Sequence, residues 1–201
     1  MAFLLITRVP VAAKYLSIDN VNLAYGLQNF DPVAHQPQPP GYPLFILFAK
    51  IVNVVVRDPE ITFLIIAVLV SGLCLPLIYA LGARMFDPWV GESALWLLML
   101  NPVFWHTGLD GPLRPNLALF SLLTAYCGWR AWNGEPRFVF WGAVALGVGG
   151  GFRPDLLVYL GPLWLVSAIA GTRSAKTVVL GCALLGAVVF VWVVGLAYAV
   201  G

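Results

Sequence analysis

The chain has 201 residues, of which 61% are hydrophobic and only 10% charged, and its mean hydropathy is +0.89. A soluble domain usually carries about 25% charged residues, and one water-soluble core could not hide this much apolar surface. The net charge of +2 comes without a long basic run, so no nucleic-acid partner is indicated. Composition therefore predicts an integral membrane protein, with lipid instead of water around its outside.

The first residues are apolar but form only a short run, 1–6, and Arg8 follows them. No basic segment precedes this run, so a signal peptide is not indicated. We expect residues 1–6 to be the end of a membrane-spanning helix. The chain also closes on an apolar run at Gly201, and we expect it to be an incomplete portion of a longer protein.

A loop over residues 17–62 comes next, and its first part predicts a short helix. Ser17 can cap a helix that begins at Ile18, and Asp19 would lie in the first turn, where the helix dipole favours a carboxylate. We expect this helix to lie on the membrane surface. Its predicted apolar face contains Ile18, Val21, Tyr25 and Leu27.

The second part of this loop is rich in proline between residues 32 and 43, which predicts an extended, stiff segment. The apolar run 43–56 follows, and at about 14 residues it suits an interfacial or re-entrant helix better than a span. A stiff segment between two interfacial helices is a plausible wall of a binding groove.

Six longer apolar runs, each bounded by charge, proline or glycine, predict six spanning helices. They lie at about 63–83, 89–106, 116–132, 138–151, 156–170 and 177–200. The predicted fold class is an all-α integral membrane protein, a polytopic helical bundle with interfacial helices in the first extracytoplasmic loop. Residues 1–201 would form a single transmembrane domain.

Charge predicts the orientation of this bundle. Arginine and lysine gather in the connections near 84–88, 130–137 and 172–176, which the positive-inside rule assigns to the cytoplasm. The opposite connections hold most of the acidic groups, His35 and the helix-end arginines Arg114 and Arg153, and His106 directly precedes one of them. These connections are 7–62, 107–115 and 151–155. Groups of both signs at one membrane boundary indicate a site on the extracytoplasmic side.

Three residues on that side are the main candidates for chemistry. Asp19 can accept a proton from a hydroxyl or bind a divalent cation, although a carboxylate here can also simply stabilise the helix start. Arg114 and Arg153 each precede a proline where a loop enters a helix, and a guanidinium suits a phosphate. The alternative is that they reach lipid headgroups or pair with Asp110 or Asp155.

Other polar or small residues are interpreted structurally. Asp110 fits a turn, and a lone loop histidine such as His35 or His106 is more often neither ligand nor proton carrier. The glycine run 147–151 lacks the features of a phosphate loop, so close helix packing is the better interpretation. The cysteines are interpreted as small core residues: Cys74, Cys127 and Cys182.

Together these residues resemble a known family. The segments 17–24 and 35–44 are similar to the first outer loop of the GT-C superfamily, and more narrowly of its protein mannosyltransferase and aminoarabinose transferase-like branch. Arg114-Pro115-Asn116 and the segment 151–155 resemble places where such proteins carry Arg-Pro-acidic motifs. Asn116 departs from the acidic residue common there, and Gln38 stands where histidine is common.

The resemblance implies a multi-pass enzyme, expected in a bacterial inner membrane, that transfers a sugar from a polyprenyl-phosphate donor. The acceptor would be a glycan, lipid or protein on the extracytoplasmic side. Asp19 takes the catalytic acidic role, as a base or as the ligand of a divalent metal ion, which would be the cofactor. The predicted substrate-binding residues are His35, Gln36, Tyr42, Asp110, Arg114, Asn116, Arg153 and Asp155.

Two other functions stay open from the sequence. A transporter or lipid flippase would need charged residues or broken helices near mid-membrane, whereas the predicted spans are almost free of charge at their centres. That pattern favours interfacial chemistry. A non-catalytic membrane subunit is the second alternative.

Overall fold

The computed structural model describes residues 18–172 and 174–200, without the side chains of residues 107–110 and 200. The run 1–6, Ser17 and Arg173 lie outside the described residues. The described part is helical, and no strand forms in it beyond one isolated bridge between Asp31 and Gln36. Its helices are α2 (Ile18–Gln28), α3 (Pro43–Val56), α4 (Pro59–Met85), α5 (Pro88–Leu100), α6 (Pro102–Asp110), α7 (Leu113–Trp132), α8 (Arg137–Phe152), α9 (Asp155–Gly171) and α10 (Ala175–Val200).

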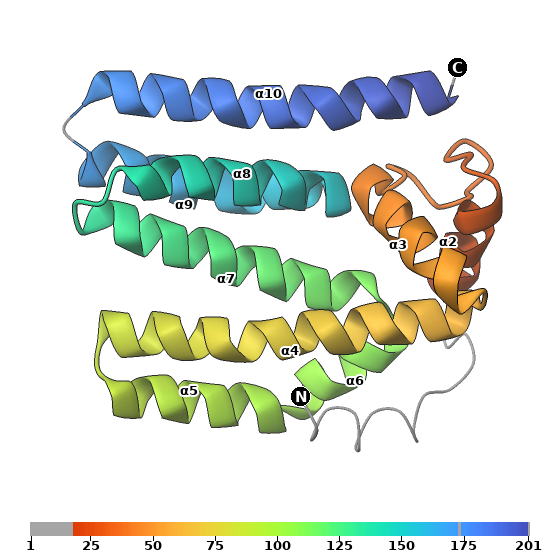
Figure 1. Ribbon diagram of the computed structural model, residues 1–201, viewed down its shortest axis with the longest axis horizontal. Helices are drawn as coiled ribbons and strands as arrows, with labels where there is room; N and C mark the ends of the chain where they lie inside the picture. Colours follow the sequence, from red (N-terminus) through yellow and green to blue (C-terminus); the bar gives the residue numbers. More distant parts are fainter. Residues whose placement is uncertain (1–17, 173, 201) are drawn as a thin grey trace.

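The long helices stack side by side, and α2 and α3 lie obliquely across one end of the stack (Figure 1). Two helices, α4 and α10, are long and apolar enough to cross a membrane. Only 11% of the apolar window of α10 is buried inside the protein. Such a long exposed apolar face is unfavourable in water but suits lipid. The prediction of an all-α membrane protein is confirmed at this level, and the number of spans stays a prediction.

The predicted second span, 89–106, is wrong as a single helix. The run divides into α5 and α6 at Asn101 and Pro102. The Asn101 side chain accepts hydrogen bonds from the N–H groups of Val103 (2.8 Å) and Phe104 (3.0 Å), which starts a new helix. Pro102 lacks the N–H that would continue α5. At 13 residues, α5 is about 20 Å long, short of the ~30 Å hydrocarbon core.

The glycine run in α8 brings four neighbouring helices close to it. A Cβ atom added at these glycines would overlap a side chain of a different neighbour in each case. The pairs are Gly147 with Val188 of α10, Gly149 with Phe120 of α7, Gly150 with Leu157 of α9, and Gly151 with Leu44 of α3. Small residues let helices approach closely in membranes. The interpretation of this run as packing, and not as a phosphate loop, is confirmed.

The core beneath α2 and α3 joins them to the bundle. Leu23, Phe45, Ile66 and Leu113 are all buried and belong to one apolar cluster. The predicted apolar face of α2 is wrong in part: Ile18 and Tyr25 are exposed, whereas Leu27 is buried on the opposite side with Asn20 and Leu23. The error follows from the 100° rotation per residue, which separates residues 18 and 27 by half a turn.

Two of the three cysteines fit the prediction of small core residues. Cys74 and Cys127 are buried, and Cys182 on α10 is exposed. Cys182 therefore lies on the apolar outer surface of α10, so the prediction is wrong for this residue.

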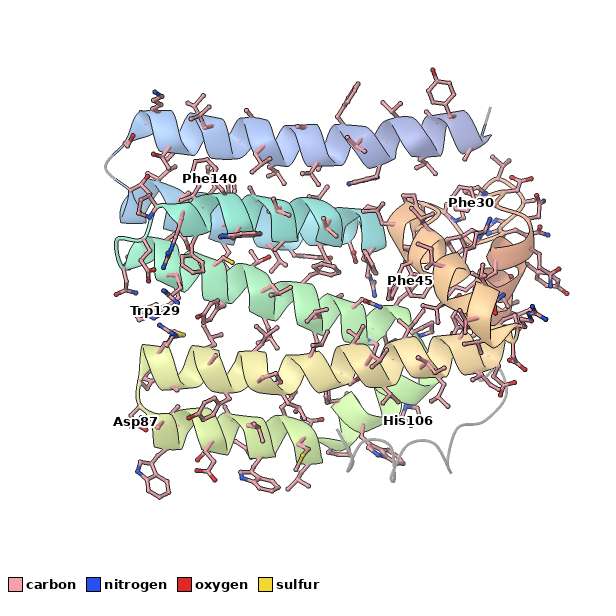
Figure 2. The ribbon with its side chains drawn as sticks, viewed as in Figure 1. Phe30, Phe45, Asp87, His106, Trp129 and Phe140 are labelled. Atoms are coloured by element: carbon pink, nitrogen blue, oxygen red, sulfur yellow. The ribbon has the colours of Figure 1, made fainter. Side chains whose placement is uncertain are left out.

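The connections divide between the two ends of the stack. The α4–α5, α7–α8 and α9–α10 connections lie at one end, which we call the arginine-rich end (Figure 1). The α2–α3 end holds α2, α3 and the α6–α7 and α8–α9 connections. Asp87 and Trp129 mark the first end in Figure 2, and His106 and Phe45 lie toward the second. The predicted grouping of connections on two sides is thus seen in the fold.

Candidate functional site

A polar cavity of about 190 Å³ lies at the α2–α3 end. Four parts of the chain build it: the first turn of α2, the loop before α3, the α6–α7 connection and the end of α8. We call it the polar cavity. Its lining residues are Asp19, Asn20, Leu23, Gln38, Tyr42, Gly111, Pro112, Leu113, Arg114 and Arg153. The predicted carboxylate and both predicted arginines therefore meet around one space.

Asp19 lies in the first turn of α2 and is exposed toward the cavity opening. The position of α2 is fixed by Leu23 and by the close approach of Gly26 to the proline-rich loop. A Cβ atom on Gly26 would lie 2.7 Å from Cδ of Pro37, which is a severe overlap. Packing of α2 against this loop therefore depends on glycine at this position.

The proline-rich loop is a compact set of turns, so the prediction of an extended, stiff segment is wrong. The Asp31 carboxylate accepts hydrogen bonds from the N–H groups of Val33 (3.0 Å) and Ala34 (3.1 Å), and its backbone pairs with Gln36. Proline fixes φ but leaves ψ free to turn the chain. The aspartate side chain supplies the hydrogen bonds that close the turn.

This turn also places two predicted substrate-binding residues, His35 and Gln36, away from the polar cavity. His35 has a φ of 59° in the turn, and its side chain is exposed to solvent. The Gln36 side chain accepts a 3.5 Å hydrogen bond from Asn29, and its backbone is held by Asp31. Neither side chain lines the polar cavity. The part of the loop that does so comes later, at Gln38 and Tyr42.

Tyr42 stands at the N-cap of α3 with a φ of 46°, in the left-handed region that residues other than glycine seldom adopt. Gly41, with a φ of 97°, precedes it, so the chain turns sharply into α3. Burial raises the pKa of the Tyr42 phenol; Arg153 opposes this shift, and Asp19 and Asp155 add to it. At neutral pH the phenol is therefore uncharged and can donate a hydrogen bond into the cavity.

Arg114 lies in the first turn of α7, where its side chain is exposed at the cavity. Asn116, two residues later and predicted to bind substrate, does not line the polar cavity. It is 1% exposed, and its side-chain amide donates a 2.7 Å hydrogen bond to the Pro112 carbonyl. Asn116 thereby stabilises the helix start that carries Arg114, from inside the fold.

Arg153 follows the last residue of α8 and pairs with Asp155 in the first turn of α9. The Nη2 atom of Arg153 lies 3.1 Å from a carboxylate oxygen of Asp155, and its Nε donates to the same carboxylate. Asp155 does not line the cavity. The alternative reading, in which Arg153 pairs with Asp155, is thus confirmed, and Asp155 orients the arginine.

The adjacent Phe152 anchors the backbone of Arg153. Its ring lies 5.1 Å from the ring centroid of Phe120 and 6.2 Å from that of Phe45, so it joins α8 to α7 and α3. Aromatic pairs at these distances add to the stability of apolar packing. The arginine therefore projects from a rigid part of the core.

A second, larger hollow adjoins the polar cavity. It has a volume of about 580 Å³, and we call it the α6–α7 groove. Its lining residues are Asn101, Val103, Phe104, Arg114, Leu117, Ala118 and Arg153. Arg114 and Arg153 line both spaces. A mostly apolar groove and a polar cavity therefore meet at two guanidinium groups.

A family model described as dolichyl-phosphate-mannose-protein mannosyltransferase matches residues 36–198 of the chain. The chain belongs to this family. The resemblance to GT-C glycosyltransferases seen in the sequence is thereby confirmed, and membership implies glycosyl transfer in a membrane. No curated protein and no solved structure matches the chain.

The mannosyltransferase family match includes Tyr42, Arg114 and Arg153, whereas Asp19 precedes the first matched residue, Gln36. The family match therefore says nothing about Asp19. Its place at the cavity is seen only in the structure, where α2 packs against the matched region. Asp110 ends α6, and its side chain lies outside the described residues.

Two cavity residues were missed in the sequence. Gln38 lines the cavity, and its Oε1 atom is buried without a hydrogen-bond partner in the described structure. Asn20 is 7% exposed and follows Asp19 on the buried side of α2. A buried unsatisfied amide oxygen is costly unless a ligand or water completes it. The clue for Asn20 was its spacing with Leu23 and Leu27, which defines the buried face.

The described residues of this mannosyltransferase-family chain contain no group of three or more histidine, cysteine, aspartate or glutamate side chains that could hold a metal ion. Hard cations prefer oxygen ligands. The cavity lining offers one carboxylate, that of Asp19, and the side-chain amide oxygens of Asn20 and Gln38. This set fits a proton acceptor better than a dedicated metal site.

Proposed function

We propose that the chain transfers a sugar from a polyprenyl-phosphate donor to a hydroxyl group of an acceptor held in the polar cavity. The observation that carries this proposal is the meeting of the polar cavity and the α6–α7 groove at Arg114 and Arg153. A donor of this class has an apolar tail, a phosphate and a polar sugar in that order. The α6–α7 groove would match the tail, the two arginines the phosphate, and the polar cavity the sugar.

The donor would place its tail along the α6–α7 groove, in contact with Val103, Phe104 and Leu117. Its phosphate would lie at Arg114 and Arg153. Guanidinium groups form short, charge-assisted hydrogen bonds to phosphate oxygens. Negative charge grows on the phosphate as the sugar–phosphate bond breaks, and fixed cations in a partly dehydrated site stabilise that charge more strongly than water does.

The acceptor hydroxyl would lie on the Asp19 side of the cavity. In the reaction, its oxygen forms a bond to C1 of the sugar while the bond from C1 to the phosphate oxygen breaks. The electron pair of that bond leaves with the lipid phosphate, and the acceptor proton moves to the Asp19 carboxylate. The neutral phenol of Tyr42 and the amide of Gln38 would orient the sugar or the acceptor through hydrogen bonds.

We assign the arginine-rich end to the cytoplasm and the polar cavity to the extracytoplasmic side of a multi-pass bundle. Arg84 and Arg130 lie in the last turns of α4 and α7, and Arg137 and Lys176 in the first turns of α8 and α10, so all four belong to the arginine-rich end. Positive residues in short connections are retained on the cytoplasmic side. A polyprenyl-phosphate sugar presented in the outer leaflet would then reach the site from the bilayer.

The test is the transfer of radiolabelled sugar from a polyprenyl-phosphate donor to acceptors in native membranes that carry variants of this chain. We expect Asp19→Asn to lower the rate about 10²–10⁴-fold, because a general base is lost. Arg114→Gln and Arg153→Gln should each lower it about 10²–10³-fold, because charge stabilisation is lost.

The controls are Glu60→Gln and Arg57→Gln, which remove the same charges near the same end but outside the polar cavity. Both should keep normal transfer. Normal transfer by Asp19→Asn would remove Asp19 from the mechanism. Movement of the donor across the bilayer without transfer of its sugar would favour the flippase instead.

A further inference from the structure

A third hollow opens on the outside of the bundle, away from the polar cavity. It lies between α4, α7 and α8 and has a volume of about 460 Å³. All ten side chains that line it are uncharged, among them Leu77, Tyr126, Phe138, Trp141 and Ala145. We call it the α4–α8 groove. Its volume falls in the range of about 300–1,000 Å³ that is typical of small-molecule sites.

The groove follows from the course of α7 in the bundle. Helices α4 and α7 lie close together toward the α2–α3 end and diverge toward the arginine-rich end (Figure 1). Five side chains of α8, from Phe138 to Val148, and four of α7 line the groove, together with Leu77 of α4. Because its surroundings in a membrane are lipid, an apolar groove of this kind is open to an acyl chain.

Three arginines surround the two aromatic residues at the arginine-rich end of this groove. The guanidinium carbon of Arg130 lies 4.4 Å from the ring centroid of Phe138 and 5.7 Å from that of Tyr126. Arg84 lies 5.8 Å from the Tyr126 ring, and Arg137 lies 5.3 Å from the Phe138 ring. The groove thus runs from an apolar interior to a cationic rim at the level of the helix ends.

One carboxylate offsets only part of this charge. Glu135 accepts two hydrogen bonds from Arg130 and one of 2.9 Å from Arg137. Two guanidinium groups sharing one carboxylate leave one net positive charge, and Arg84 adds another. The Arg137 side chain is 70% exposed, and Arg84 is exposed as well. Both can reach an anion at the rim, whereas Arg130 is held by Glu135 and Tyr126.

We propose that the α4–α8 groove binds an anionic glycerophospholipid, with one acyl chain in the groove and its phosphate between Arg84 and Arg137. The combination of an uncharged groove and a cationic rim matches a lipid with a negative headgroup. Basic residues at the cytoplasmic surface attract such lipids. A zwitterionic lipid would gain the groove contacts but less from the rim. The site is separate from the polar cavity and does not require glycosyl transfer.

The location also separates this lipid from the sugar donor. The rim lies at the arginine-rich end, whereas Arg114 and Arg153 lie at the opposite end of the bundle. A phosphate bound at Arg84 and Arg137 is therefore too far from Asp19 to take part in transfer. The bound lipid would instead fill the space where α4 and α7 diverge and hold these helices in place.

The test uses the purified chain in detergent, titrated with phosphatidylglycerol or phosphatidylcholine, with bound lipid measured by native mass spectrometry. We expect phosphatidylglycerol to bind preferentially. Arg84→Gln and Arg137→Gln should each weaken its binding about fivefold, as expected for one basic residue near an anionic lipid. The matched control is Lys176→Gln, which removes one charge at the same end but on α10. It should leave binding unchanged.

A second variant tests the groove itself. Ala145→Phe places a ring in the groove and should remove binding of both lipids, with helix content unchanged by circular dichroism. Equal binding of the two lipids by the unmodified chain would overturn the proposal. Full binding by a chain that carries both Arg84→Gln and Arg137→Gln, or by Ala145→Phe, would also overturn it. Displacement of the phosphatidylglycerol by an equal amount of polyprenyl phosphate would show that the groove is a donor site and would also overturn it.

Discussion

At the scale of single residues, the site depends on how a few charged side chains are held. Arg153 is oriented by a carboxylate two positions later, and its backbone is anchored by the aromatic contacts of Phe152. An arginine that is already oriented loses less conformational entropy when it binds a phosphate. We therefore expect Asp155 to act as a positioning residue, through Arg153, since it does not line the polar cavity.

This role predicts a distinct kinetic effect of Asp155→Asn. The variant keeps the hydrogen-bonding shape but loses the charge that orients Arg153, so donor binding should weaken. We expect KM for the donor to rise about tenfold, the cost of one weakened charge-assisted hydrogen bond, with a smaller change in kcat. Asp155→Glu should recover part of the loss. A fall in kcat at unchanged KM would instead place Asp155 among the reacting groups.

A second prediction concerns Glu135, whose pKa is lowered to about 2 by its hydrogen bonds with Arg130 and then Arg137. A carboxyl with a lowered pKa in the folded state stabilises the fold above its unfolded pKa of about 4.5, and that stability is lost as pH falls toward 2. Glu135→Gln should therefore lower the thermal midpoint at pH 7. The difference from the unmodified chain should shrink between pH 4.5 and pH 2. A constant difference across this range would contradict the ion-pair explanation.

The charged site residues were predictable from sequence, while their neighbours were not. Asp19, Arg114 and Arg153 stand at predicted helix boundaries, and charge at a membrane boundary is informative by itself. His35, Gln36 and Asn116, predicted as substrate-binding residues, do not line the polar cavity. Their orientation depends on hydrogen bonds of Asp31 and Pro112 that no residue pattern specifies.

At the scale of helices, starts were predicted to within a few residues where proline or aspartate starts a helix: α4 begins at Pro59 and α5 at Pro88, against predicted starts of 63 and 89. Asp58 accepts hydrogen bonds from the N–H groups of Glu60 and Ile61 at the start of α4, and Asp87 does so from Val90 at the start of α5. The break at Asn101 was not predicted, because the apolar pattern continues across it. An apolar run indicates that a segment contacts lipid or the protein core, which holds for both α5 and α6. It does not indicate whether the helix is continuous.

The packing of α2 on the proline-rich loop gives a prediction for Gly26. Gly26→Ala should destabilise the α2–α3 end by about 1–3 kcal/mol, because the new methyl group overlaps Pro37. Transfer should fall with it, since Asp19 and Gln38 are carried by these two segments. Thermal unfolding and the transfer assay measure the two effects.

The matched control for this substitution is Gly186→Ala in α10, where a Cβ atom would meet nothing within 4 Å. Alanine is the better helix former by about 1 kcal/mol, so this variant should be neutral or more stable. Equal behaviour of the two variants would mean that the contact of Gly26 with Pro37 does not hold α2 in place.

At the scale of the whole molecule, the segregation of charge and the topology agree. The alternation of helices puts three connections at the arginine-rich end, and the polar cavity forms at the other end. Sequence predicted this division because successive predicted spans reverse the chain direction, and α5 and α6 together replace one of those spans, so the side of a connection follows from its place in the order. The oblique positions of α2 and α3 across the cavity end depend on the core of Leu23, Phe45 and Leu113, and this arrangement needed the structure.

The orientation in the membrane is the prediction that belongs to this scale. In a background with Cys182→Ala, which removes the exposed cysteine, we expect Val33→Cys to react with a membrane-impermeant thiol reagent added to intact cells. Val33 is 77% exposed in the loop before α3. Ser174 is exposed between α9 and α10, and Ser174→Cys should react only after the membrane is opened. The reverse pattern would put the polar cavity in the cytoplasm, where a donor presented in the outer leaflet could not reach Arg114 and Arg153.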